Sequence, residues 1–211
     1  MSILPRASAL APFRVKSFRF QWPSDLVTSW AFEMETLILG WYVLVQSGSV
    51  MMLALFGALN YMGALISPAF GVAGDRIGHR EVLSLMRGTF ALLAALLMVL
   101  AFNEALTPEI VLAIALLNGL VRPSDMGVRG ALVAATVPRD VLMASVGLSR
   151  TTSDSARVIG ALTGAGLFAA FGIAYAYVAI VAFYLPGLAF TLQTEPMTQS
   201  AGSGARAAPS H

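Results

Sequence analysis

The chain has 211 residues, of which 57% are hydrophobic and 11% are charged, with a net charge of +2 and no cysteine. A soluble domain normally carries about 25% charged residues, so this chain has too little polar surface to be hydrated on every side, and its basic residues are too scattered for a nucleic-acid surface. Disulfides and thiolate sites are excluded, and two histidines, His79 and His211, are too few for a histidine-rich metal site. The composition therefore predicts a protein in a lipid bilayer, with no metal and no nucleic-acid partner.

Six apolar stretches are long enough to cross the bilayer, since a helix rises 1.5 Å per residue and the hydrocarbon core is about 30 Å thick. In chain order they are 24–45, 49–70, 82–102, 110–133, 141–171 and 173–192. The last two are separated at Phe171-Gly172, within an uncharged stretch. We therefore predict a cytoplasmic segment over 1–23, a six-helix bundle over 24–192 and a disordered cytoplasmic tail over 193–211, whose small and polar residues bury too little apolar area.

The basic residues predict the orientation of these helices. Lysine and arginine precede the first helix and occur around the second and fourth connections, whereas the first, third and fifth connections contain none. Because short cytoplasmic loops are enriched in these residues, both termini are expected in the cytoplasm.

Charged residues within the apolar stretches form two stripes. An ionisable group at membrane depth costs at least about 2.5–3.5 kcal/mol on insertion scales, so such groups are expected to face protein or water. Residues three and four apart share one face of a helix, and the stripes are Arg122, Asp125 and Arg129, and Arg150, Asp154 and Arg157. Each aspartate is placed to neutralise the arginines of its own helix. The stripes are either an ion-pair network that holds two helices together or a polar gate that opens during transport, and these hypotheses are compatible.

Two carboxylates, Glu33 and Glu35, lie about 10–15 Å along the first predicted helix. Residues two apart point about 200° apart, so these side chains cannot face the same space. A carboxylate that is removed from water favours its protonated form, which is the property a proton-coupling group needs. We expect one of the two to couple protons or to bind a cation, with hydrogen bonding to a neighbouring helix as the alternative. The sequence leaves open which one faces a cavity.

Small residues in the fifth predicted helix favour a close helix contact. Gly160 and Gly164 form a GxxxG step, which Gly166 continues. Such a step lets the backbone of another helix approach.

The second connection contains the segment Gly71-Val72-Ala73-Gly74-Asp75-Arg76-Ile77-Gly78-His79-Arg80. This segment resembles motif A of the major facilitator superfamily, a cytoplasmic turn with a glycine, three residues, aspartate, a base, any residue, glycine and a basic pair. The matching positions are Gly71, Asp75, Arg76, Gly78 and Arg80, and His79 stands where the family usually has arginine or lysine. The resemblance implies a charge relay of Asp75, Asp125 and either His79 or Arg80.

Other segments resemble the drug and siderophore exporter branch of that superfamily, the group of macrolide efflux and enterobactin export proteins. These segments are Phe18-Arg19 with Trp22, Glu35-Thr36, Gly40-Trp41, Asp125 with Arg129, Val137-Pro138 and 156–160. The likeness covers about 18–192 and corresponds to the N-terminal half of a fold with two six-helix halves. Gly160-Ala161 stands where the branch usually has Gly-Pro, so the antiporter signature is incomplete.

The resemblance implies an all-α membrane protein, a six-helix half of the major facilitator fold, in the bacterial inner membrane. Such a protein is a secondary active transporter and not an enzyme, without a cofactor, which exports a hydrophobic or amphipathic small molecule by alternating access as a proton antiporter. The motif residues would govern the cytoplasmic gate, and Glu33 or Glu35 would couple protons. The transport path would be completed by a homodimer of halves or by a complementary C-terminal half; the alternative is a truncated or remnant subunit without transport activity of its own.

Overall fold

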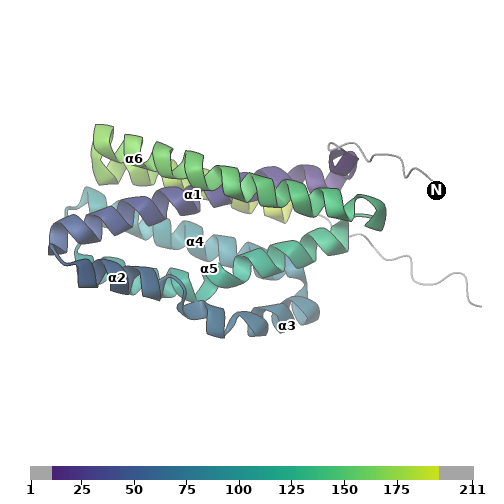
Figure 1. The fold of residues 1–211 in the computed structure, drawn as a ribbon, viewed down its shortest axis with the longest axis horizontal. Coiled ribbons are helices and arrows are strands. Elements are labelled where there is room, and N and C mark those ends of the chain that lie inside the picture. Colours follow the sequence, from purple (N-terminus) through teal and green to yellow (C-terminus); the bar gives the residue numbers. More distant parts are fainter. Residues whose placement is uncertain (1–10, 195–211) are drawn as a thin grey trace, which may run out of the picture.

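The computed structural model describes residues 11–194, which form a bundle of helices that run along a common long axis (Figure 1). The chain starts with a short 3-10 helix, η1 (Ala11–Arg14). The elements that follow are α1 (Lys16–Ser47), α2 (Val50–Leu59), η2 (Met62–Leu65), α3 (Ser67–Ile77), α4 (His79–Phe102), α5 (Pro108–Thr136) and α6 (Arg139–Leu192). The described part of the chain contains no strand. The all-helical expectation is therefore confirmed for these residues, while residues 1–10 and 195–211, most of the predicted tail, lie outside them.

Local sequence explains where several helices begin and end. The hydroxyl groups of Ser49 and Thr107 accept hydrogen bonds from the backbone N–H groups of Met52 and Ile110, so each caps the start of a helix. Gly48 ends α1 in the left-handed conformation at φ 61°, which glycine adopts without strain.

Three helices, α4, α5 and α6, are each long and apolar enough to cross a membrane, and the bent pair Val50–Leu65 and Ser67–Ile77 makes a fourth candidate. The two parts of that pair differ in direction by 46°, so the second predicted stretch, 49–70, is bent near its end, and the bent pair continues to Ile77. Pro68 explains part of the interruption, because it lies in the first turn of α3, where its missing N–H breaks no bond, but could not continue a preceding helix. The count of six spans stays a prediction.

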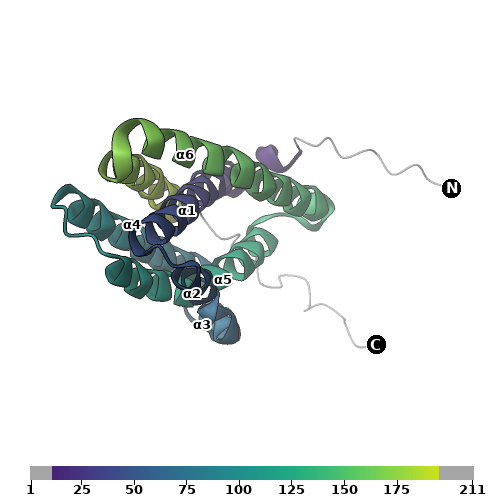
Figure 2. The same ribbon diagram turned by 60° about the vertical axis from the view of Figure 1, so that its left-hand side comes forward.

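The long helix α6 is broken at Gly172, which has φ 79° and ψ 177°. This is the position at which the sequence predicted a break. Gly164 lies against Met34 before the break, and Tyr184 donates a hydrogen bond to Glu35 after it, so the chain returns along α1 (Figure 2).

The helix α1 lies at the centre of the bundle and packs most extensively against α6. Ala31, Met34, Ile38 and Val43 are fully buried along it. The close approach to α6 depends on glycine, because a Cβ atom added at Gly164 would lie 2.8 Å from the Met34 Cα atom. The close helix contact predicted from the GxxxG step is confirmed, and its partner is α1.

Candidate functional site

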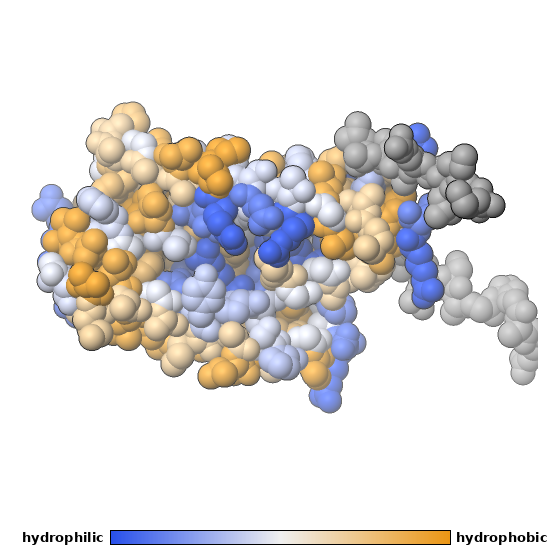
Figure 3. Space-filling model, viewed as in Figure 1, coloured by the Kyte–Doolittle hydropathy of each residue, from blue (hydrophilic) through white to orange (hydrophobic). Residues whose placement is uncertain are grey.

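A cavity of about 500 Å³ lies between α1, α2, α5 and α6. Figure 3 shows this region as a hydrophilic hollow between apolar surfaces on either side. Aromatic and apolar residues, among them Phe32, Phe56, Tyr61 and Met126, line part of it. The charged residues that line it are Glu33, Arg122, Asp125, Arg129 and Arg157. The cavity can thus contact both an apolar group and a charged group of one ligand.

Glu33 lines the cavity and connects three helices. Its Oε1 atom lies 3.9 Å from Nη2 of Arg122 on α5 and 3.8 Å from Nε of Arg157 on α6. Arg122 is held in place by a 2.6 Å hydrogen bond to the Thr36 hydroxyl group and by the Phe32 ring, whose centroid lies 4.6 Å from the guanidinium carbon. The carboxylate of Glu33 is therefore the shared counter-ion of two arginines on facing helices.

Glu35 lies inside the bundle, on another side of α1. Its Oε2 atom accepts a 2.7 Å hydrogen bond from the Tyr184 hydroxyl group, and its Oε1 atom accepts one of 3.3 Å from the Asn118 amide. It borders a void of only about 10 Å³. Of the two carboxylates that the sequence could not distinguish, Glu33 is the one that lines the large cavity.

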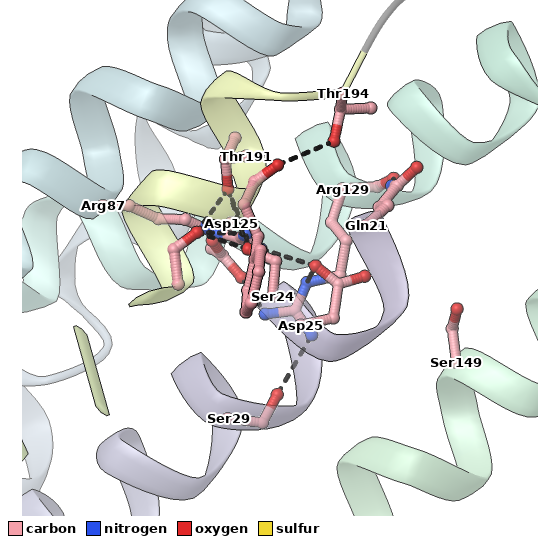
Figure 4. A network of polar contacts seen from close by, with 12 residues as sticks. Gln21, Ser24, Asp25, Ser29, Arg87, Asp125, Arg129, Ser149, Thr191 and Thr194 are labelled. Atoms are coloured by element: carbon pink, nitrogen blue, oxygen red, sulfur yellow. Dashed lines mark hydrogen bonds and ion pairs between the residues drawn. The ribbon is translucent and has the colours of Figure 1, made fainter. Parts of the chain in front are cut away.

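A buried network of two aspartates and two arginines lies beside the cavity (Figure 4). Oδ1 of Asp25 lies 2.5 Å from Nη2 of Arg87 and 3.4 Å from Nε of Arg129, and Nη2 of Arg129 lies 2.5 Å from Oδ2 of Asp125. Arg87 also donates to the hydroxyl group of Thr191 near the end of α6. The network therefore joins α1, α4, α5 and α6.

Sequence reasoning did not identify Arg87 or Asp25 as site residues. Arg87 contributed only to the predicted orientation, and its partner lies 62 residues away, a separation that no helical spacing reveals. The available signal was the stripe on α1 that Asp25 shares with Thr28 and Glu35.

The two predicted stripes pair differently from the expectation. Asp125 pairs with Arg129 and Asp154 pairs with Arg150, each within its own helix. The other arginine of each stripe is paired with Glu33 on α1 instead, so the expectation that each aspartate neutralises both arginines is wrong. Arg122, Asp125, Arg129 and Arg157 line the cavity, whereas Arg150 and Asp154 form an exposed pair outside its lining.

The motif segment is more helical than predicted. Gly71, Asp75 and Arg76 belong to α3 and are exposed, and the turn is confined to Gly78, whose φ of 108° favours glycine. His79 begins α4, and its Nε2 atom lies 3.5 Å from Oδ1 of Asp75.

Within residues 11–194, no ion pair joins the motif to Asp125. Nε of Arg80 lies 3.3 Å from Oε1 of Glu81, and Asp125 is paired with Arg129. The contact between Asp75 and His79 is one part of the implied relay, whereas Asp125 has its ion pair with Arg129 on its own helix, and the role of these residues as a relay stays a prediction.

An apolar helical bundle around a polar cavity is the arrangement of a multi-pass membrane protein. The profile of the transmembrane secretion effector family matches residues 7–202. The chain belongs to this family and is a transporter of the major facilitator type. No curated protein matches the chain.

Proposed function

We propose that this protein exports a hydrophobic or amphipathic small molecule across the bacterial inner membrane by alternating access. The observation that carries the proposal is the cavity of about 500 Å³, which combines aromatic side chains with charged ones between four helices. Pockets of this size bind small organic ligands through apolar walls and a few placed polar groups. The description of the family as secretion effectors supports export as the direction.

Glu33 is the proposed proton-coupling group. It borders the cavity, and its carboxylate holds arginines of α5 and α6 against α1. Protonation would remove that attraction, so that α5 and α6 could move relative to α1. Glu35 is the second candidate, but it is enclosed by hydrogen bonds from Asn118 and Tyr184.

The motif residues and the buried network are proposed to govern the cytoplasmic gate. The Asp75 side chain pairs with His79 but is 76% exposed, so it can also contact a second helical bundle; Arg76 and Arg80 follow it in the sequence. Asp25, Arg87, Asp125 and Arg129 would stabilise one of the two access states, since the network links four helices.

Reconstituted vesicles test the transport and coupling assignments. The full chain is inserted into vesicles that contain trapped pyranine as a pH indicator and one of three fluorescent probes: naphthalenesulfonate, naphthalenesulfonamide or trimethyl(naphthylmethyl)ammonium. Neither charged probe titrates near neutral pH, so any pH change belongs to the protein. We expect protein-dependent release of at least one probe with a simultaneous change of internal pH, and we expect Glu33→Gln to abolish the pH change.

Glu35→Gln is measured in parallel, and Asp154→Asn serves as the control because this exposed carboxylate does not line the cavity. Release of no probe above that from protein-free vesicles would contradict the transport assignment. If neither glutamine variant alters the pH change, the coupling assignment is wrong; if only Glu35→Gln alters it, coupling belongs to Glu35.

A further inference from the structure

The cavity carries more positive than negative charge. Three arginines line it, against two carboxylates, Asp125 and Glu33. One of the arginines, Arg129, has two carboxylates as ion-pair partners, because Asp125 lies 2.5 Å away and Asp25 lies 3.4 Å away. The excess positive charge therefore lies at the other two arginines.

Arg122 and Arg157 share one oxygen atom of Glu33. The distances of 3.9 and 3.8 Å are longer than those of direct hydrogen bonds. A guanidinium has five N–H donors, and the Arg157 side chain is 65% exposed with Glu33 as its one ion-pair partner among residues 11–194. Donors of both arginines remain available to a second anion.

We propose that Arg122 and Arg157 bind the anionic head group of an amphipathic substrate, a carboxylate, sulfonate or phosphate. The planar fork of a guanidinium matches the oxygen atoms of such groups. The apolar part of the substrate would lie against Phe32, Phe56 and Met126, which line the same cavity. This inference rests on the proposed function, in that the cavity is taken as the substrate site.

Glu33 is then a built-in competitor of the substrate. Its charged carboxylate and the anionic head group require the same two guanidinium groups, so the anion binds more tightly when Glu33 is protonated. The other charged or titratable groups around the cavity are Asp125 and Arg129 on α5 and Tyr61 after α2. Asp125 and Arg129 are already paired with each other, and the Arg150–Asp154 pair on α6 lies outside the lining.

Because the anion binds more tightly when Glu33 is protonated, binding of the proton and binding of the anion favour each other, and this determines the direction of coupling. Antiport requires the proton and the substrate to exclude each other, whereas this site takes up both together. The proton and the anion therefore move in the same direction, so export of the anion carries a proton outward and is driven by the outward gradient of the anion, against the inward proton gradient. This differs from the antiport that the sequence resemblance implies.

Calorimetric titration of the full chain in lipid nanodiscs tests the inference, with empty nanodiscs subtracted. We expect naphthalenesulfonate to bind about tenfold or more tightly than naphthalenesulfonamide or the ammonium probe, the ratio expected from one charged hydrogen bond. Affinity for the sulfonate should rise as the pH falls, and no substitution is needed for this measurement. Glu33→Gln should raise the affinity and remove the pH dependence, while Arg157→Gln and Arg122→Gln should each lower it about tenfold.

Arg150→Gln is the matched control, since this arginine lies on the same helix and is similarly exposed but does not line the cavity. Equal affinities for the three probes, pH-independent binding by the unmodified chain, or weaker sulfonate binding by the Glu33→Gln variant would each overturn the inference. Vesicle release without preference for the sulfonate would overturn it and leave the proposed function standing. Selective sulfonate binding without release of any probe would support it and contradict transport.

Discussion

Arg87 is the residue on which the buried network depends. It is 1% exposed, and its guanidinium donates to Asp25 on α1 and Thr191 on α6. We predict that Arg87→Gln lowers the free energy of unfolding by about 3–5 kcal/mol, because it leaves a buried carboxylate without its closest partner. Thermal unfolding of the purified chain in detergent measures the change.

Arg150→Gln is the control for this prediction, since an exposed pair contributes about 0–1 kcal/mol. The double variant Asp25→Asn with Arg87→Gln should recover part of the loss, because neither charge is then left unpaired. If Arg87→Gln lowers the free energy of unfolding as little as Arg150→Gln does, the network does not stabilise the bundle.

At the residue scale, sequence predicted pairs within a helix better than pairs between helices. The spacing of four that links Asp125 to Arg129 is a property of one helix, and both residues lie where that spacing placed them. The pairing of Glu33 with Arg122 depends on the rotation and depth of two helices that meet only in the folded bundle. The spacing of charged residues along one helix carries no information on the rotation or the depth at which two helices meet. The sequence therefore identified charged residues that line the cavity, but not the residues on other helices with which they pair.

The contact between α1 and α6 is an element-scale feature that is sensitive to a single methyl group. We predict that Gly164→Ala lowers the free energy of unfolding by about 1–3 kcal/mol, because its Cβ atom would lie 2.8 Å from the Met34 Cα atom and the helices would have to separate. Thermal unfolding in detergent is again the measurement.

Gly166→Ala adds the same methyl group to α6 at a position that makes no close contact with α1. No atom lies within 4 Å of a Cβ at Gly166, so this change should be neutral or stabilising through higher helix propensity. Equal effects of the two substitutions would show that helix propensity, and not the packing of α6 on α1, decides the outcome.

The break at Gly172 is determined by one residue, whereas the bend between α2 and α3 depends on several residues. Gly172 has a positive φ that favours glycine, and the sequence predicted the break there. The bend between α2 and α3 includes η2 and two close helix contacts, in which Gly63 lies against the backbone of Leu120 and Gly119 lies against that of Leu59. Those contacts involve α5, so the apolar run over 49–70 gave no sign of them.

At the scale of the whole molecule, the bundle leaves charged side chains exposed on the open side of the cavity. Arg157 precedes the break at Gly172 by about 22 Å on the helical rise per residue, so it lies within a hydrocarbon core about 30 Å thick if the break marks the outer surface. Its side chain is 65% exposed, and a charge in lipid at that depth is costly. We therefore expect a second bundle to cover the open side of the cavity.

In a bilayer that contains only this protein, the covering bundle has to be a second copy of the chain, and cysteine crosslinking can detect it. The chain has no cysteine, so each substitution gives a unique thiol. Ser153 lines the cavity, and the exposed Ser155 points about 200° away on the same helix. A thiol-specific crosslinker should join two copies through Ser153→Cys and not through Ser155→Cys. Monomers alone with both variants would contradict the dimer, while equal crosslinking would place the contact elsewhere on α6.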